Sequence, residues 1–440
     1  MSKGEGGAVY EQVTNSCLAS AIGPNGLGDK EFRAGLKAAG KVLERLAATK
    51  RPDEKAIFDL VQRRDDLVGV AGHLDAIKAS ASDVVVFGIG GSSLGGQAAT
   101  AIVKNSDGPV LHFPENPDPD RLTRLLDRLP LAGTHFFTIS KSGGTPEPLA
   151  ALFAAMAKVK SGGGDLGAQF TVITEPAKGD DSGGNVLRRL ARRHGMTAFD
   201  HDPHLGGRFS VLSLVGMIPA VFAGLDPAAF RIGAATVLNK ALTAKNAESC
   251  APALGAVLAA GLELHSGVGV SVMFPYADAL DRLAMWYRQL WAESLGKEGH
   301  GTVPVRALGP VDQHSQLQLY LDGPADKLFT ILMPDWRDQG PVIEPDLADD
   351  PALEYLSGRT VGDLVHAEAR ATAETLTKAG RPVRSFHLAR LDEATLGALF
   401  MHFMLETIIT AELLGVDPFG QPAVEAGKKL TRQYLMEARR

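Results

Sequence analysis

Two short loops of the same build constrain the fold of this 440-residue chain more than any other feature. The first occupies residues 88–96 (GIGGSSLGG) and follows the apolar segment 83–87, and the second occupies residues 140–145 (SKSGGT) and follows residues 135–139. Both patterns are typical of a strand that gives way to a helix. Helix N-termini offer unpaired N–H groups and a partial positive charge, and glycines let the backbone approach an anion closely. The sequence therefore predicts two strand–loop–helix units that hold a phosphate.

Hydroxyl and ammonium groups would complete this phosphate cradle, from Ser92, Ser140, Lys141, Ser142 and Thr145. The spacing of the residues in these loops does not fit either of two common nucleotide-binding motifs. A dinucleotide fingerprint needs glycine three positions after Gly90, where Ser93 stands, and a P-loop needs Gly-Lys-Ser/Thr where this chain has two glycines. The simplest alternative is a tight turn without a ligand, which would explain one loop more easily than two.

The composition bounds the class of protein. A chain of 440 residues with 45% apolar residues, in which strands alternate with helices, favours two α/β lobes with parallel sheets. The formal charge of −6 gives no general attraction to nucleic acid or to an anionic membrane. Only Cys17 and Cys250 occur, which excludes a disulfide framework and favours a reducing compartment. With no apolar run of ~18 residues and no N-terminal signal core, we expect a cytoplasmic protein without nucleic-acid or membrane partners.

Hydrophobic periodicity gives the expected order of elements. Residues 29–78 have helical spacing and predict a helical lead-in. Apolar runs predict strands over residues 84–87, 110–113, 135–139 and 170–174, and, after a second alternation begins near Ala251, over residues 267–274, 327–333 and 382–388. Helices are expected over residues 209–222, 278–295, 350–378 and 393–414, with a further helix from about Pro422.

A candidate general base lies at the end of the helix expected over residues 278–295. Gln289 and Glu293 are four residues apart and share one face of it. Gly296 ends the helix, so Glu293 lies in the last turn, where carbonyl dipoles disfavour a carboxylate and should increase its proton affinity. Such a carboxylate suits general-base catalysis. A single glutamate at a helix end is, however, more often an ordinary surface charge.

Three further polar residues stand beside predicted helix starts. Arg208 follows two glycines, His314 belongs to residues 312–315 (DQHS) after Pro310, and Lys428 follows Gly427. Taken singly, each of these residues is more simply explained as a helix cap or as a solvent-exposed side chain. Together with two phosphate loops, they favour one shared site.

Six blocks that include these residues occur in the order found in glucose-6-phosphate isomerases, which the chain resembles from about residue 80 to residue 435. The blocks are residues 88–95 (GIGGSSLG), 140–147 (SKSGGTPE), 206–210 (GGRFS), 293–297 (ESLGK), 312–315 (DQHS) and 421–428 (QPAVEAGK). The resemblance implies two sugar-isomerase (SIS) domains, each a parallel five-stranded sheet flanked by helices in three α/β/α layers, and a homodimer with composite active sites. We expect a helical N-terminal segment over residues 1–78, a first SIS domain over 79–235, and a second over 236–440 that carries the C-terminal helices.

The resemblance also implies a catalytic role for four residues. Glu293 matches the base that moves a proton between C2 and C1 of the open-chain sugar, and Arg208 matches the cation that stabilises the enediolate. His314 and Lys428 match the groups that open the sugar ring, with His314 donated by the neighbouring subunit.

The remaining matches concern positioning. Glu147 matches the carboxylate that orients the histidine. The substrate-binding matches are Gly91, Ser92, Ser140, Lys141, Ser142, Thr145, Gln289 and Gln421. The chain departs from the usual pattern at Gly144, Pro148 and Ala423, which concern pocket width and phosphate grip.

The resemblance implies an aldose–ketose isomerase of glycolysis and gluconeogenesis that converts glucose 6-phosphate to fructose 6-phosphate without a metal, a nucleotide or another cofactor. Three alternatives remain open: an isomerase that also accepts mannose 6-phosphate, a sulfosugar isomerase, and a non-catalytic sugar-phosphate sensor. The sensor would be expected to lack Glu293, His314 or Lys428, and all three are present.

Overall fold

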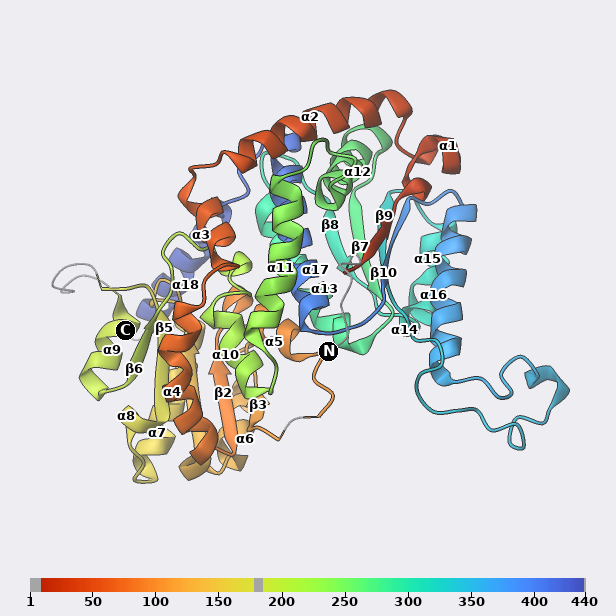
Figure 1. The fold of residues 1–440 in the computed structure, drawn as a ribbon. Helices are drawn as coiled ribbons and strands as arrows, with labels where there is room; N and C mark the ends of the chain where they lie inside the picture. Colours follow the sequence, from red (N-terminus) through yellow and green to blue (C-terminus); the bar gives the residue numbers. More distant parts are fainter. Residues whose placement is uncertain (1–8, 106, 178–184, 439–440) are drawn as a thin grey trace.

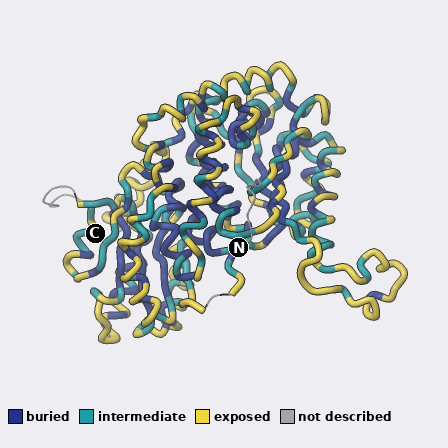
Figure 2. The backbone as a smooth tube through the Cα atoms, in the orientation of Figure 1, coloured by how far each residue is buried: buried dark blue, intermediate teal, exposed yellow. Residues whose placement is uncertain are grey.

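Two five-stranded sheets lie side by side in the computed structural model, which describes residues 9–105, 107–177 and 185–438 (Figure 1). Helices cover both faces of each sheet, as expected for three-layer α/β/α units. Buried backbone runs through the middle of both units, and exposed backbone lies around their outside (Figure 2).

The first sheet is fully parallel, with strand order β3-β2-β4-β5-β6. Its strands are β2 (Asp83–Phe87), β3 (Val110–His112), β4 (Thr134–Ile139), β5 (Phe170–Thr174) and β6 (Thr197–Asp200). β4 and β5 are buried along their whole length, as befits near-continuous apolar runs covered on both faces. β6 did not stand out in the sequence because it is a short, half-exposed edge strand.

The helices of this first unit are α4 (Asp65–Ser80), α5 (Leu94–Thr100), α6 (Pro119–Arg128), α7 (Pro146–Ser161), α8 (Leu166–Gln169), α9 (Val186–His194) and α10 (Leu214–Phe222). The chain passes from β2 to β3 on one side and later returns to β4 on the other side of β2. The point where the strand order reverses therefore lies between β2 and β4. Ligands of open α/β sheets bind outside the carboxyl ends of the strands at such a point.

The second sheet has strand order β1-β10-β9-β7-β8. β7 (Val270–Pro275), β8 (Val303–Arg306), β9 (Lys327–Pro334) and β10 (Val383–Leu388) are parallel, but β1 (Glu11–Val13) pairs antiparallel with β10, Gln12 opposite Phe386. The expectation of five parallel strands holds for the first sheet only. The N-terminal segment is likewise not purely helical, because β1 covers the otherwise open edge of β10.

A core of long helices joins the two sheets. It contains α2 (Asp29–Ala47), α11 (Pro227–Leu242), α12 (Ala251–Ser266), α13 (Asp281–Leu295) and α17 (Glu393–Leu414). α17 has the bounds expected from the sequence. It is also long and apolar enough to cross a membrane, but 94% of its most apolar window is buried inside the protein, as is typical of a core helix. Cys17 and Cys250 are free and buried.

The other helices of the described residues are α1 (Ala19–Ile22), α3 (Pro52–Leu60), α14 (Val311–Ser315), α15 (Leu317–Asp322), α16 (Val361–Lys378) and α18 (Glu425–Glu437). The helix expected over residues 350–378 begins only at Val361, where Thr360 and Asp363 form a reciprocal capping box. The helix expected over residues 209–222 likewise begins at Leu214, after a short 3₁₀ turn (Gly207–Phe209).

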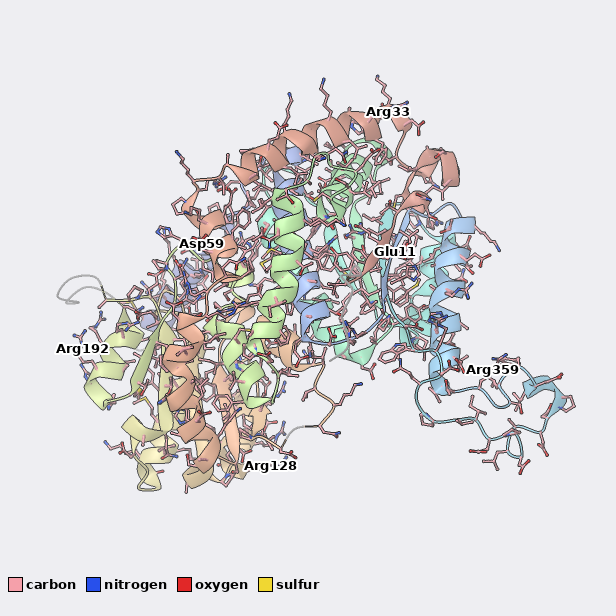
Figure 3. All side chains as sticks on the ribbon, viewed as in Figure 1. Glu11, Arg33, Asp59, Arg128, Arg192 and Arg359 are labelled. Atoms are coloured by element: carbon pink, nitrogen blue, oxygen red, sulfur yellow. The ribbon has the colours of Figure 1, made fainter. Side chains whose placement is uncertain are left out.

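Residues 337–360 form an arm that extends away from the body of the protein between β9 and α16 (Figures 2 and 3). The arm is mostly exposed, with Arg359 near its return to the body. It also exposes apolar side chains: Leu347 is 85% exposed and Tyr355 is 69% exposed. These two side chains are therefore largely uncovered in the single chain.

Candidate active site

The two predicted phosphate loops meet at the switch point of the first sheet. β2 and β4 are adjacent and parallel, with Phe87 opposite Thr138, so residues 88–92 and 140–145 leave the same edge of the sheet. Two helices then start from these loops, α5 at Leu94 and α7 at Pro146. The strand order brings together the backbone N–H groups that the sequence assigned to an anion.

The second loop is closed by its own side chains. Ser140 Oγ and Thr145 Oγ1 are hydrogen-bonded at 2.9 Å, and the Gly144 N–H donates to Ser142 Oγ at 3.4 Å. Gly143 adopts a φ of +65°, and a Cβ there would lie 1.7 Å from Asn185 Oδ1, so only glycine fits. Thr145 is the residue before α7 but its hydroxyl does not cap the helix, in contrast to the usual role of threonine at this position.

The first loop packs directly on the segments that carry the other candidate residues. A Cβ on Gly91 would lie 2.2 Å from the carbonyl carbon of Gly207, and a Cβ on Gly90 would lie 2.6 Å from Gln289 Nε2. These two glycines therefore permit the approach of Arg208 and of α13 to the phosphate loop.

Arg208 is the centre of the cluster. Its side chain is 3% exposed. Nε donates to Ser294 Oγ (2.8 Å), and Nη1 donates to Glu293 Oε2 (3.2 Å) and Gln421 Oε1 (2.9 Å). Nη2 donates to the carbonyls of Pro418 (2.5 Å) and Gly420 (3.1 Å). Burial lowers the pKa of Arg208, and Glu293 opposes that shift. All five N–H groups have acceptors, so the cation is held in one orientation.

Glu293 is held between a cation and an amide. Gln289 Nε2 donates to its Oε1 at 3.0 Å, while Arg208 contacts Oε2. The side chain is 30% exposed and lies in the last turn of α13, with Gly296 as the C-cap, as the sequence predicted. Gln289 Oε1 is buried without a hydrogen-bond partner among the described residues, which leaves one acceptor beside the carboxylate.

A further basic residue, Lys297, adjoins this cluster. Its Nζ donates to the carbonyls of Phe419, at 3.0 Å, and Asp417. Burial lowers the pKa of Lys297, and the nearby charge of Arg208 lowers it further. The sequence contained Lys297 in one of the six blocks but gave it no role, because its partners lie more than a hundred residues away.

The sequence and fold of this chain match known proteins. The family model of phosphoglucose isomerase matches residues 68–305. A glucose-6-phosphate isomerase from Rubrobacter xylanophilus is 41% identical over 361 residues, which cover 80% of this chain and 82% of that protein. The chain belongs to the phosphoglucose isomerase family.

Solved structures agree with this membership. A hypothetical protein from Thermus thermophilus has a TM-score of 0.84 at 34% identity, over 97% of this chain and 99% of that one. A glucose-6-phosphate isomerase from Chlamydia trachomatis has a TM-score of 0.81 at 20% identity, over 98% of this chain and 89% of that one, and so supports the fold alone.

Two residues that the family resemblance assigned to ring opening lie apart from this cluster in the single chain. His314 is exposed on the five-residue helix α14, near Glu368 of α16. Lys428 is 58% exposed on α18 and pairs with Glu425 at 2.7 Å. Among the described residues, neither side chain has a hydrogen bond or an ion pair with Arg208 or Glu293. The predicted site is therefore only partly assembled within one chain.

The other predicted residues lie on or beside the phosphate loops. Glu147 is half-buried in the first turn of α7. Lys141 Nζ lies 4.0 Å from Glu175 Oε1, and the lysine side chain is 31% exposed. Ser92 belongs to the 3₁₀ turn that precedes α5. These residues therefore lie within the two loops or in the first turn of the helix that follows the second loop.

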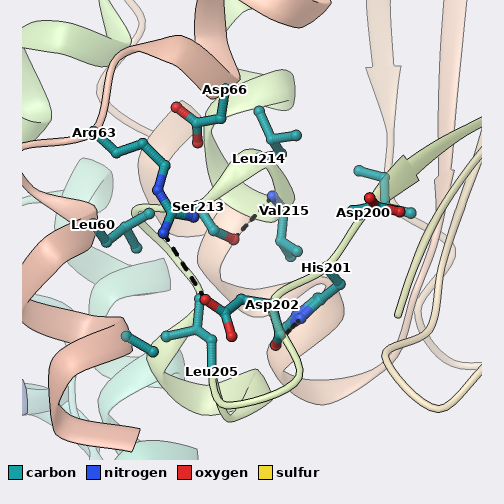
Figure 4. Close-up of a pocket in the computed structure, with 12 residues that line it drawn as sticks. Leu60, Arg63, Asp66, Asp200, His201, Asp202, Leu205, Ser213, Leu214 and Val215 are labelled. Atoms are coloured by element: carbon teal, nitrogen blue, oxygen red, sulfur yellow. Dashed lines mark hydrogen bonds and ion pairs between the residues drawn. The ribbon is translucent and has the colours of Figure 1, made fainter. Parts of the chain in front are cut away.

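A cavity of about 40 Å³ with polar and apolar lining residues lies farther along the same end of the first sheet, after β6 (Figure 4). Its lining includes Arg63, Asp66, His201 and Asp202, and Arg63 Nη2 lies 4.0 Å from Asp202 Oδ2. Burial lowers the pKa of His201. The cavity has room for one or two water molecules and is too small for a sugar phosphate.

The second sheet offers no equivalent of the phosphate loops at its own switch point between β7 and β9. The segments that follow these strands are Tyr276-Ala277 and Asp335-Trp336, without a glycine-rich turn. The indole Nε1 of Trp336 donates to the Tyr276 carbonyl at 2.8 Å and fills the space between the strand ends. No group of three or more His, Cys, Asp or Glu side chains that could hold a metal occurs within the described ranges.

Proposed function

We propose that this chain is a glucose-6-phosphate isomerase that interconverts glucose 6-phosphate and fructose 6-phosphate in glycolysis and gluconeogenesis. One observation carries the proposal. A partly exposed carboxylate, Glu293, is held between the Arg208 guanidinium and the Gln289 amide, directly beside a glycine loop suited to a phosphate. A base, a fixed cation and an anion cradle are the three parts that an aldose–ketose isomerisation of a phosphosugar needs.

The substrate phosphate would bind where residues 88–92 and 140–145 meet, with backbone N–H groups and the Lys141 ammonium as donors. The hydroxyls of Ser92, Ser140, Ser142 and Thr145 would add hydrogen bonds to its oxygens. These contacts would be made in every state of the reaction, so we assign them to binding rather than to rate.

Proton transfer would follow at the other end of the sugar. Glu293 takes the C2 proton of the open-chain aldose, the C2–H electron pair forms a C1=C2 double bond, and the C1 carbonyl oxygen becomes an enediolate oxygen. The fixed positive charge of Arg208 stabilises the negative charge on that oxygen. Glu293 then returns the proton to C1, and the O2 proton passes to O1, so that O2 becomes the ketose carbonyl and O1 becomes a hydroxyl.

Ring opening would require residues that one chain does not bring to the cluster. We assign it to His314 of a second copy, oriented by Glu147, and to Lys428. Exposed apolar side chains support a homodimer: Leu347 and Tyr355 on the arm and Tyr434 and Leu435 on α18, of which the last two are 62% and 63% exposed. We retain the division into residues 1–78, 79–235 and 236–440, and a cytoplasmic location, as parts of this proposal.

The purified protein should equilibrate glucose 6-phosphate with fructose 6-phosphate in the presence of EDTA and without nucleotide. The same assay with mannose 6-phosphate, and with a sulfonate analogue of glucose 6-phosphate, would define the substrate class. If the folded protein binds a sugar phosphate without turning over any of the three, it is a sensor and the proposed function is wrong.

A further inference from the structure

The loop that carries Gln421 is tied to the protein by three separate basic residues. This loop, residues 415–421, connects α17 to the 3₁₀ turn before α18. Arg208 contacts the Pro418 and Gly420 carbonyls and the Gln421 side chain, and Lys297 contacts the Asp417 and Phe419 carbonyls. The four consecutive carbonyls of residues 417–420 therefore accept hydrogen bonds from cations, which restrains the backbone of the loop.

The third basic residue comes from the other end of the sequence. Arg51 precedes α3, and its Nη2 donates to Asp417 Oδ1 at 2.8 Å. Its guanidinium also lies 5.0 Å above the centre of the Phe419 ring, and that ring contacts Phe209 at 5.4 Å. Arg51 therefore contacts the loop by an ion pair and by a cation–π contact, and the ring that it covers adjoins the residue after Arg208.

A neighbouring ion network fixes the base of the loop to the same N-terminal helices. Arg45 of α2 donates to Glu412, near the end of α17, and to Glu54 of α3, which is fully buried. The N-terminal helices thus hold both the last turn of α17 and the loop that follows it.

Val416 and Pro418 are buried, and the Val416 N–H donates to the Ala411 carbonyl at 2.9 Å, so packing fixes the first part of the loop. The cations support its last part. Every described residue from Gln421 to Ala438 is exposed, so α18 adds no buried contact that would fix the loop from its other end. The order of the loop decides where Gln421 lies and whether three of the five N–H groups of Arg208 have acceptors.

We infer that Arg51 and Lys297 are positioning residues, which hold residues 415–421 so that Gln421 and Arg208 keep their places at the reacting end of the substrate. Arg51 lies outside residues 68–305, which match the family model. The inference rests on the proposed function for its kinetic consequences, but the order of the loop can be measured without any activity.

The test compares Arg51→Ala, Lys297→Met and the double variant with the parent protein. The matched control is Arg33→Ala on α2, since Arg33 is also an ion-paired arginine, 76% exposed, but its ion pair is with Asp29 of its own helix. Hydrogen–deuterium exchange of residues 415–424 reports the loop directly. Isomerisation kinetics and inhibition by inorganic phosphate report the site.

Exchange in residues 415–424 should rise by roughly two- to fivefold in Arg51→Ala, because an exposed ion pair and a cation–π contact are both modest. The rise should be larger in Lys297→Met and largest in the double variant, whose kcat should fall by roughly tenfold. KM and phosphate inhibition should change by less than about threefold, since the phosphate loops are untouched. Arg51→Lys, which retains the ion pair, should restore part of the protection.

Unchanged exchange in the loop of the double variant would overturn the inference, whatever the kinetics. A fall in kcat with a matching loss of phosphate affinity, or exchange that rises throughout the protein, would also overturn it, since either would indicate general destabilisation. An inactive parent would instead refute the proposed function, and the exchange data would still decide whether the three cations hold the loop.

Discussion

Glu293→Gln separates the chemistry from the architecture of the site. Glutamine keeps the shape of the side chain, and its carbonyl oxygen can still accept the bond that Arg208 Nη1 now donates at 3.2 Å. The amide cannot take a proton from C2. Loss of a general base lowers turnover by ~10²- to 10⁴-fold, so we expect kcat to fall at least ~100-fold, or about 2.7 kcal/mol in activation free energy.

The stability cost should be small by comparison. Glu293 is 30% exposed, and four of the five N–H groups of Arg208 keep their present acceptors. Replacement of one partly solvated charged acceptor by a neutral one should cost about 1 kcal/mol, or less than about 4 °C in Tm. A large fall in kcat at a nearly unchanged Tm therefore isolates the proton transfer.

The assay follows fructose 6-phosphate conversion with a coupling dehydrogenase, together with deuterium incorporation at C2 from D₂O. Glu298→Gln is the matched control, because Glu298 is an exposed carboxylate five residues further along the chain. The control should keep parental turnover. If Glu293→Gln retained more than a tenth of the parental kcat, or still exchanged the C2 proton with solvent at the parental rate, Glu293 would not be the base.

Further predictions concern the phosphate loops and the proposed dimer. Thr145→Ala should raise KM by roughly ten- to a hundredfold, with a smaller change in kcat and weaker inhibition by phosphate; an unchanged KM in a folded variant would make the second loop a structural turn. Gly91→Ala should abolish activity and lower Tm, since its Cβ would lie 2.2 Å from the Gly207 carbonyl carbon. Gly144→Ala, whose Cβ would meet nothing within 4 Å, should fold with the parental Tm. Equal Tm values of the two variants would contradict this prediction. If His314 is donated across a dimer, a mixture of His314→Ala and Glu293→Gln subunits, refolded together, should recover roughly a quarter of the parental activity, and recovery of none would place His314 in its own subunit's site.

The fold was predictable where burial alone decides the structure. β4 and β5 are continuous apolar runs, and α17 is apolar on every side, so the sequence located all three. β6 and β8 were missed because edge strands are short and half-exposed, and Pro304 interrupts the pattern of β8. β1 is only three residues long and gains its pairing from a strand at the other end of the chain.

The candidate site was predictable as a set of residues but not as a set of contacts. The position of Glu293 in a last helical turn follows from the glycine after the helix. The backbone partners of Arg208 could not be inferred, because the carbonyls of Pro418 and Gly420 carry no sequence signature. The hydroxyl of Thr145 bonds to Ser140 rather than capping α7, because loop closure competes for the same oxygen.

The pairing of β1 with β10 sets an order of events during synthesis. Residues 11–13 leave the ribosome early, but their partners are residues 385–387, so the second sheet cannot be completed until almost the whole chain has emerged. At roughly 5–20 residues per second, the N-terminal strand must wait on the order of 20–75 s. The first sheet needs only residues 83–200 and can form in that interval. A nascent chain stalled before residue 383 would therefore carry a formed first sheet, while residues 11–13 would still lack the strand with which they pair.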